Sequence, residues 1–564
     1  MHKLQGVLAI GLSLSLAACG STGLQSAPAA SVLNSQTVGA GQYLVGFKAG
    51  AGINSQAIFK VGGKVTKSWQ KLSAVAATLS PSAVASLQSD PTVEYVEQDV
   101  RRSADVYQET DAGGTATTSG RPGLTTGTGT TTLWSPSGES TYGTVALNSP
   151  VLNANGFTGS GVAVCVADTG IDGGHPEFAG KLKGYRNFMG DAHDTAYDGN
   201  EHGTHVSGTI FAQVGNGSAG LLTGMNPAGV VGVTPGVNLY MARVLGDDGS
   251  GSSSGVVDGV NWCVSQLKSQ GGTEDHVIVS LSLGSPDGSK TEQRAFAKAY
   301  EAGVLTVAAS GNTGTNEPHY PASYPTVMAI GAIDARGNLA SFSTFGKQVD
   351  LVAPGVDVLS TVPRGLGSSA DASAAGVAAY SSVLAGSPPT FGEVNAPLAA
   401  AAGNHQLCAP DAALAGKIAL ISRGTCSFAV KVQNAASSGA VAAIIYNNRT
   451  GTISMSLGTT AQAIPAVSIT QDDGAATLTA LQNSSPVASH VKIYHADYAY
   501  LSGTSMATPH VAAAAALVWA SKPNLTNDQL GALLRATATD LGAKGRDDYF
   551  GHGLVNPTRA ISGN

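Results

Sequence analysis

The chain has 564 residues, which is too long for one ordinary domain and predicts two to four folded units. Hydrophobic residues make up 43% and charged residues 12%, with 73 glycines. This composition suits an exported globular protein with tight turns and excludes a largely disordered one. The formal net charge of -7, without a basic stripe, argues against nucleic acid as a partner.

The N-terminus has the features of an export signal. His2 and Lys3 precede an apolar run over residues 7–16, which is too short to span a membrane comfortably. The run ends in Leu-Ala-Ala-Cys19-Gly, which resembles a bacterial lipobox, so residues 1–18 are predicted to be a signal peptide. Cys19 would then carry a lipid and attach the chain to a membrane. The alternative is an ordinary signal peptide that happens to contain a cysteine.

A compact α+β unit is predicted over residues 42–100, after a polar spacer over residues 19–41. Three segments indicate strands, with another strand after Gly62-Gly63, and Ser80-Pro81 supplies a cap residue and a first-turn proline for a helix. The strands are predicted at Tyr43–Phe47, Ala74–Leu79 and Val93–Glu97. Residues 101–141 are rich in Thr, Gly and Ser without an apolar period, which predicts a flexible linker.

Residues 142–366 alternate between apolar strands and helical segments. Near-continuous apolar strands between helices predict an α/β fold with a parallel sheet covered by helices on both faces. The strands are predicted at Val162–Ala167, Val277–Leu283, Val304–Ala309 and Val327–Ala332, and the helices at His205–Ala212, Gly255–Lys268 and Glu292–Ala302.

An insertion is predicted over residues 367–491, before the chain returns to the same unit over residues 492–564. Strand-like segments begin near Gly416, Ala442 and Ile464, and an alanine-rich helix lies between the first two.

Four cysteines remain besides Cys19, and export allows them to form disulfides. Cys408 and Cys426 lie in one local segment and are the best candidate pair. Cys165 lies in an apolar strand and Cys263 in a helical pattern. These two could pair with each other or stay as buried thiols.

Three motifs carry Asp168, His202 and Ser505 in that chain order: V-A-D-T-G-I-D, H-G-T-H-V-S-G-T and G-T-S-M-A-T-P-H. Ser505 comes just before an alanine-rich helical run, where a hydroxyl and a free backbone N–H can lie together at a helix N-terminus. The order Asp, His, Ser is that of subtilisin. The chain therefore resembles the subtilisin-like serine proteases of the subtilase family.

The resemblance implies a role for each motif residue. Ser505 would be the nucleophile, His202 its base and Asp168 the carboxylate that orients the imidazole, whereas His205 would be structural. Asn312, after a predicted strand, matches the family's oxyanion asparagine and would act with the Ser505 N–H. Without the resemblance, an asparagine after glycine would be a turn residue.

The resemblance also implies a primary specificity pocket, where substrate would bind as an added strand. His319 falls near the floor of that pocket, or else is a surface histidine on a loop. The pocket walls would be Ser282, Leu283, Gly284, Ala309, Ser310 and Gly311.

Two further units and one metal site follow from the same resemblance. Residues 42–100 resemble the inhibitory propeptide of subtilases, and residues 367–491 the protease-associated domain, which could affect substrate access or be a plain surface insertion. Asn226 lies in a segment like a family calcium loop, but Glu177 stands where a shorter aspartate is usual. The spacing of His and Cys does not fit a catalytic zinc site.

The sequence thus predicts a serine endopeptidase that cleaves proteins or peptides, needs no catalytic cofactor and is made as a self-processing zymogen inhibited by its own propeptide. The cut is predicted between Val100 and Tyr142, with Tyr107 just before it, and active enzyme is expected both at the cell envelope and in the medium. One alternative is a surface binding protein that keeps the scaffold without cleaving. Another is a peptidase narrowed to one target by its inserted domain.

Overall fold

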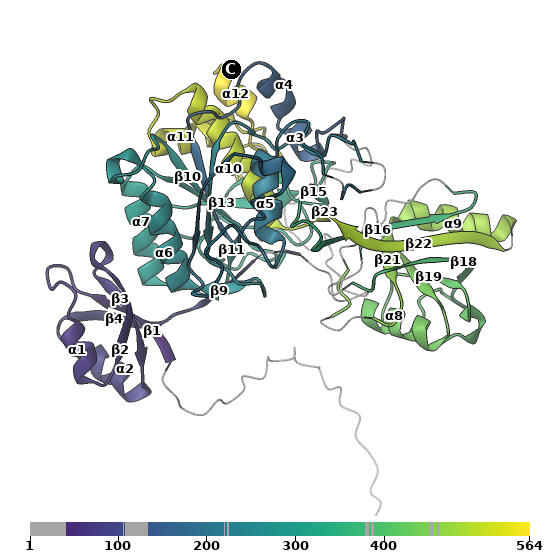
Figure 1. The fold of residues 1–564 in the computed structure, drawn as a ribbon, viewed down its shortest axis with the longest axis horizontal. Coiled ribbons are helices and arrows are strands. Elements are labelled where there is room, and N and C mark those ends of the chain that lie inside the picture. The colour runs from purple at the N-terminus through teal and green to yellow at the C-terminus, as the bar shows by residue number, and fades with distance from the viewer. Residues whose placement is uncertain are drawn as a thin grey trace, which may run out of the picture.

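The computed structural model describes residues 41–104, 106–107, 133–218, 220–222, 225–377, 383–384, 389–449, 453, 455–458, 462–484 and 486–563. They form an N-terminal unit (41–100), a central unit (133–366 and 497–563) and a lateral unit (367–496), as Figure 1 shows. Within the described residues, no helix is both long and apolar enough to cross a membrane.

A seven-stranded parallel sheet forms the middle of the central unit, in the order β14-β13-β12-β10-β6-β8-β7. Every residue of β6, β10, β12 and β13 is buried, as expected for strands covered on both faces. These four strands correspond to the four predicted apolar runs. The bounds are β6 Ala163–Asp168, β7 Leu182–Asn187, β8 Asn238–Arg243, β10 Val277–Leu281, β12 Leu305–Ala309, β13 Met328–Ile333 and β14 Val349–Pro354.

Helices cover both faces of this sheet, which confirms the predicted fold class. Alternate strand residues point to opposite faces, so the sheet separates two hydrophobic cores. Helices α5 and α10 pack in one core, and α6 and α7 in the other (Figure 1). The helices are α3 Tyr142–Ala146, α4 Ser149–Ala154, α5 His202–Phe211, α6 Ser253–Val264, α7 Lys290–Glu301, α10 Thr504–Ser521, α11 Asn527–Thr537 and α12 Pro557–Ser562.

Two disulfides join elements of the fold. Cys165 of β6 is bonded to Cys263 of α6, which decides between the two alternatives left open for these residues. Cys408 is bonded to Cys426 in the lateral unit, as predicted.

The N-terminal unit is a four-stranded sheet in the order β2-β3-β1-β4, packed on two short helices. The predicted cap is present, because the Ser80 hydroxyl accepts a hydrogen bond from the Ala83 N–H at 3.2 Å. The elements are β1 Gly41–Phe47, α1 Ser55–Lys60, β2 Lys64–Trp69, the 3-10 turn η1 Gln70–Leu72, β3 Ala74–Leu79, α2 Pro81–Gln88 and β4 Val93–Gln98.

The first residues of the predicted linker form a strand instead. Strand β5 (Arg101–Ala104) lies between β9 (Ser250–Ser252) and β11 (Leu283–Gly284) and is antiparallel to both. The predicted strand over residues 277–283 is also interrupted, because Ser282 separates β10 from β11 and the two belong to different sheets. This three-stranded sheet places a piece of the N-terminal segment against the central unit.

The lateral unit is a second seven-stranded sheet, in the order β16-β22-β18-β19-β20-β21-β17, with hydrophobic clusters on its two faces. The antiparallel pair β15 (Val358–Thr361) and β23 (Tyr498–Leu501) connects it to the central unit (Figure 1). Its elements are β16 Gly367–Ala374, β17 Val383–Leu384, β18 Gly392–Ala400, β19 Ile418–Ser422, α8 Phe428–Ser437, β20 Ala442–Tyr446, β21 Ala466–Ile469, α9 Gln471–Asn483 and β22 Val487–Ala496.

Candidate active site

Asp168 and His202 form a buried pair at the carboxyl end of the central sheet. Asp168 is the last residue of β6 and His202 the first of α5, and neither side chain is exposed. His202 Nδ1 lies 2.7 Å from Asp168 Oδ1, which also accepts the Thr169 N–H at 2.7 Å. A carboxylate in this place fixes the tautomer and the plane of the imidazole ring.

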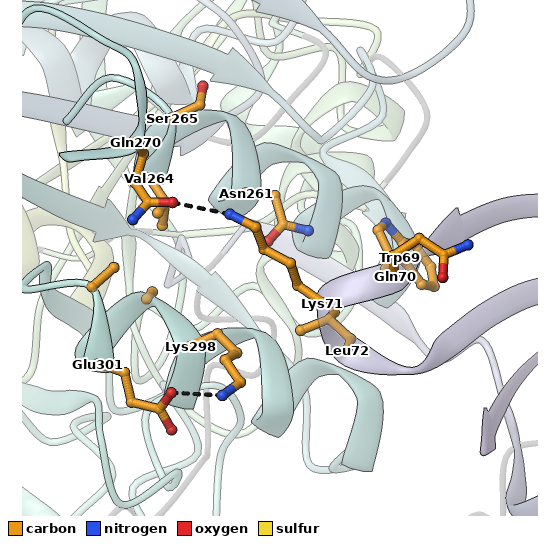
Figure 2. Close-up of a pocket in the computed structure, with 12 residues that line it drawn as sticks. Trp69, Gln70, Lys71, Leu72, Asn261, Val264, Ser265, Gln270, Lys298 and Glu301 are labelled. Atoms are coloured by element: carbon orange, nitrogen blue, oxygen red, sulfur yellow. Dashed lines mark hydrogen bonds and ion pairs between the residues drawn. The ribbon is translucent and has the colours of Figure 1, made fainter. Parts of the chain in front are cut away.

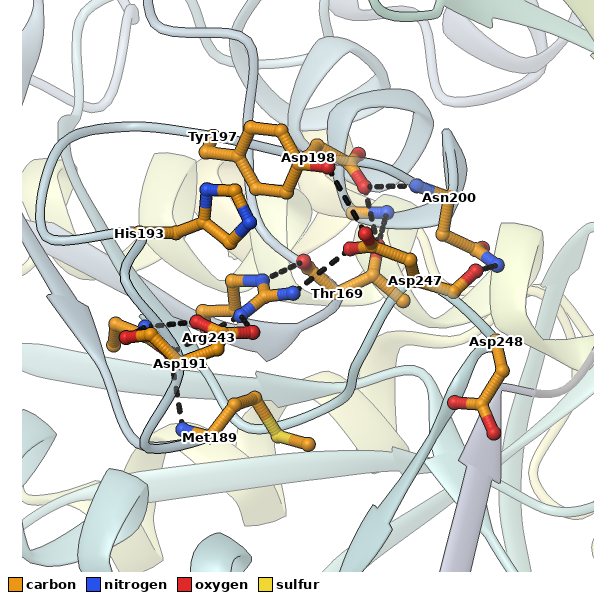
Figure 3. Close-up of polar contacts among 12 residues, drawn as sticks. Thr169, Met189, Asp191, His193, Tyr197, Asp198, Asn200, Arg243, Asp247 and Asp248 are labelled. Atoms are coloured by element: carbon orange, nitrogen blue, oxygen red, sulfur yellow. Dashed lines mark hydrogen bonds and ion pairs between the residues drawn. The ribbon is translucent and has the colours of Figure 1, made fainter.

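A polar network holds the end of β6 against the start of α5 (Figure 3). The Thr169 hydroxyl donates to Asp198 at 2.9 Å and accepts the Gly203 N–H at 2.9 Å. Asp198 Oδ2 accepts the N–H and the hydroxyl of Thr204, at 2.9 and 2.6 Å. Arg243 Nε donates to the Thr169 carbonyl oxygen at 3.0 Å. These contacts fix the two backbones that carry Asp168 and His202.

Ser505 lies in the first turn of α10 and is fully buried. Its hydroxyl donates to the Ser282 carbonyl oxygen at 2.9 Å, and the Ser282 hydroxyl donates back to the Ser505 carbonyl oxygen at 2.8 Å. The first turn of a helix leaves backbone N–H groups without helical partners, so it can stabilise negative charge. Helix α10 also packs directly against α5, which begins at His202.

Asn312 is joined to the serine segment through Thr504. Asn312 Oδ1 accepts the Thr504 N–H at 2.9 Å and the Thr504 hydroxyl at 3.0 Å. The Gly311 N–H donates to the same hydroxyl at 3.2 Å. With its oxygen held by Thr504, the side-chain amide has a fixed orientation and its NH₂ group is directed away from Thr504. Sequence reasoning missed Thr504, although it directly precedes Ser505 in the motif.

The predicted pocket walls meet around His319. A Cβ atom added to Gly284 would lie 2.2 Å from His319 Cε1, and one added to Gly311 would lie 2.9 Å from its Cγ. His319 Nδ1 lies 3.3 Å from the Ala309 carbonyl oxygen, and the side chain is buried. His319 is therefore placed between the two wall segments and is not a surface histidine.

Two other histidines near the pair have structural contacts. His205 Nε2 lies 2.9 Å from the Val358 carbonyl oxygen and 3.2 Å from that of Ala499, and burial lowers the pKa of His205 to about 3. His510 Nδ1 lies 2.7 Å from the Met506 carbonyl oxygen, and burial lowers its pKa to about 4. Both rings are therefore neutral at physiological pH.

The candidate calcium ligands are bonded to protein donors. Glu177 Oε1 accepts the Tyr498 hydroxyl at 2.8 Å and the Val230 N–H at 3.1 Å, and Asn226 Oδ1 accepts the Ala228 N–H at 2.9 Å. Burial raises the pKa of Glu177 to about 7. Among the described residues, no three His, Cys, Asp or Glu side chains group as metal ligands. Calcium binding stays a prediction of the family resemblance.

Comparison with known proteins gives the family. Residues 159–387 match the model of the subtilase family, and residues 394–477 match that of the PA domain. Subtilisin NAT of Bacillus subtilis subsp. natto is 34% identical over 333 residues, which cover 57% of this chain and 74% of that protein. The chain belongs to the subtilase family. The predicted family and the protease-associated domain are thus confirmed, and the chain is a serine endopeptidase that acts on protein substrates.

Another subtilisin and a solved subtilisin-like protease are also similar to this chain. Subtilisin Savinase of Lederbergia lenta is 42% identical over 222 residues, covering 39% of this chain and 74% of that protein. The solved structure of a psychrophilic subtilisin-like protease from the Antarctic psychrotroph Pseudoalteromonas sp. AS-11 is similar with a TM-score of 0.58 and 31% identity, over 75% of this chain and 98% of that chain. The residues matched to the subtilase model include Asp168, His202 and Asn312, whereas Ser505 follows the PA domain.

Proposed function

We propose that this subtilase hydrolyses peptide bonds through Asp168, His202 and Ser505, with an acyl-enzyme intermediate. The observation that carries the proposal is the buried Asp168–His202 pair, at 2.7 Å. His202 begins α5, and α5 packs against α10, which carries Ser505 in its first turn. In the structure the Ser505 hydroxyl donates to Ser282, so attack requires it to turn toward His202 about its side-chain bond.

The proposed reaction uses these three side chains, the Asn312 amide and the Ser505 backbone N–H. Ser505 Oγ attacks the substrate carbonyl carbon while His202 Nε2 takes the hydroxyl proton, and Asp168 stabilises the imidazolium that forms. The Asn312 amide and the Ser505 N–H donate to the oxyanion. His202 returns the proton to the leaving amine, and water attacks the acyl-enzyme by the same route to release the acid and restore Ser505.

Replacing Asn312 with alanine tests the oxyanion assignment. We expect Asn312→Ala to lower kcat roughly 10²–10³-fold with little change in KM, because its donor stabilises charge that exists only near the transition state. Steady-state hydrolysis of a chromogenic peptide measures both constants, and an unchanged melting temperature checks the fold. A variant with wild-type kcat would show that another group supplies this donor.

We further propose that residues 42–100 are an inhibitory propeptide, on the support of its contacts with two helix N-termini. Glu97 accepts the Lys290 N–H at 2.9 Å and the Thr291 N–H at 2.9 Å at the start of α7. Asp99 accepts the Ser254 N–H at 2.8 Å at the start of α6. Carboxylates at these places are favoured by the helix dipole.

A hydrophobic cluster and a polar contact also join the two units. Leu44, Trp69 and Leu72 pack with Val257 and Ala295, and Trp69 Nε1 donates to Asp258 at 2.6 Å. A groove of about 490 Å³ lies between η1 of the N-terminal unit and helices α6 and α7 (Figure 2). Lys71 crosses it and donates to Gln270 at 2.9 Å, while Lys298 pairs with Glu301 of its own helix. Inhibition would thus depend on the contacts at the helix N-termini, on this hydrophobic cluster and on β5.

Export and maturation complete the proposal. The precursor would be exported through its signal peptide, carry a lipid on Cys19 and be cut by its own active site between Val100 and Tyr142, which frees the active enzyme from the anchor. We expect mass spectrometry of the soluble active enzyme to find its N-terminus in that interval, and of the membrane-bound precursor to find a lipidated Cys19. An active soluble form that begins before Val100 would contradict the proposed cut. A precursor without lipid on Cys19 would contradict the proposed anchor.

A further inference from the structure

Arg102 is completely buried although it lies on β5, outside the central unit. Its Nε and Nη2 donate to the two carboxylate oxygens of Glu292, at 3.1 and 2.6 Å, and Glu292 is equally buried. Its Nη1 donates to the Ser285 hydroxyl and to the Asp287 carbonyl oxygen, the latter at 2.8 Å. The guanidinium is therefore held by a bidentate carboxylate and two further acceptors, which is the geometry that arginine satisfies best.

All these acceptors belong to the central unit. We call Ser285, Asp287, Glu292 and Tyr324 the Glu292 pocket. Glu292 lies in the first turn of α7, and the Tyr324 hydroxyl donates to its Oε2 at 2.8 Å. The Ser289 N–H donates to the Tyr324 oxygen at 2.7 Å, so the tyrosine is held in turn by the start of α7. The pocket would therefore stay on the enzyme when β5 leaves.

Strand β5 runs along the pocket toward the nucleophile. Ser103 and Ala104 pair with the two residues of β11, in antiparallel register. Leu283, the partner of Ala104, directly follows Ser282, whose carbonyl oxygen accepts the Ser505 hydroxyl. The chain thus approaches the candidate nucleophile in the extended form expected for a bound substrate.

Tyr107 contacts the segment that precedes the nucleophile. The Tyr107 N–H donates to the Ser502 carbonyl oxygen at 2.8 Å, and its ring stacks on Phe342 with centroids 4.3 Å apart. Ala104 and Tyr107 therefore contact Leu283 and Ser502, in the two segments that adjoin the candidate nucleophile. This register favours a cut before Tyr107, whereas the sequence suggested one after it.

We propose that the Glu292 pocket selects protein substrates that present an arginine where Arg102 lies, a few residues before the bond to be cut. This rests on the proposed function, since it assumes that substrates occupy the place of β5. A substrate with a neutral side chain there would leave the Glu292 carboxylate desolvated and unpaired, which is strongly unfavourable. Lysine would restore the charge but not the bidentate contact.

Peptides taken from the chain itself test the proposal. Internally quenched peptides of residues 98–110 would be compared as wild type, Arg102→Leu, Arg102→Lys and, as the matched control, Arg101→Leu. Arg101 is the neighbouring arginine. Its side chain is 72% exposed and forms an ion pair with Asp248 at 3.4 Å. With mature enzyme we expect kcat/KM to fall about 10²-fold for the Arg102→Leu peptide and about 10-fold for the Arg102→Lys peptide. The control should change less than about threefold.

A second comparison changes the enzyme. In Glu292→Gln, the ratio of kcat/KM for the wild-type peptide to that for the Arg102→Leu peptide should fall from about 10² toward about 1, since the charge that requires a partner is gone. Glu301→Gln, at the exposed end of the same helix, should keep the wild-type ratio. If Glu292→Gln does not mature, the proposal is decided by the ratio of kcat/KM for the wild-type and Arg102→Leu peptides, measured with the wild-type enzyme.

Casein hydrolysis, followed in parallel, separates the two possible failures. An enzyme that hydrolyses casein but cuts the wild-type and Arg102→Leu peptides equally, or cuts neither, overturns the arginine pocket. A chain that hydrolyses neither casein nor any peptide overturns the proposed function itself.

Discussion

Ser505→Ala is expected to abolish peptide hydrolysis and to leave the precursor uncut. Loss of the hydroxyl removes the nucleophile for substrate and for self-processing together, and in subtilisin the equivalent loss lowers kcat roughly 10⁶-fold. The variant should accumulate as full-length chain on a gel and show no activity above background with a chromogenic peptide.

The matched control is Ser521→Ala, at the other end of α10, where the hydroxyl donates to the Val518 carbonyl oxygen of its own helix. It should be processed and active like the wild type. Mature-sized Ser505→Ala protein in a preparation free of other proteases would contradict self-processing.

Asp168→Asn is expected to lower kcat about 10⁴-fold while the fold is kept, because an amide can favour the wrong imidazole tautomer. The Asp168 carboxylate accepts from His202 and from the Thr169 N–H, and asparagine keeps nearly the same shape without the charge. Precursor processed in trans by a trace of wild-type enzyme, which is then removed, allows kcat to be measured on the mature variant.

Asp275→Asn is the control for that substitution, since Asp275 lies on the surface in an exposed ion pair with Lys268 at 2.6 Å. Its kcat should equal that of the wild type. If Asp168→Asn had wild-type kcat with an unchanged melting temperature, the His202 imidazole would not depend on this carboxylate.

The strands at the middle of the sheet were predictable because they are buried on both faces. A short, continuous apolar run between helical segments indicates a buried strand, as in Val277–Leu281 and Met328–Ile333. The edge strand β7, Leu182–Asn187, was missed because it has no fully buried residue and reads as a polar segment. Strand β8 ends in Arg243, a charged residue that is unusual in a buried strand. Its burial is explained by the hydrogen bond to Thr169, which the sequence does not reveal.

The residues of the candidate site could be predicted from their motifs. The residues that contact and position them could not. Nothing local marks Thr504 as the partner of Asn312, because the two are 192 positions apart. Strand β5 precedes a Thr/Gly-rich segment, and it forms by pairing with β9 and β11, which are far from it in the sequence. Glu292 reads as an ordinary acidic residue of a first helical turn until Arg102, 190 positions earlier, is placed beside it.

Covalent labelling tests the central claim, that Ser505 is the nucleophile, most directly. Diisopropyl fluorophosphate transfers its phosphoryl group to an activated serine oxygen as fluoride leaves, so the mature enzyme should lose activity in proportion to the label it takes up. Peptide mapping by mass spectrometry should then find one label per chain, on Ser505, and none on Ser505→Ala. Full inactivation with the label on any other residue would contradict the account.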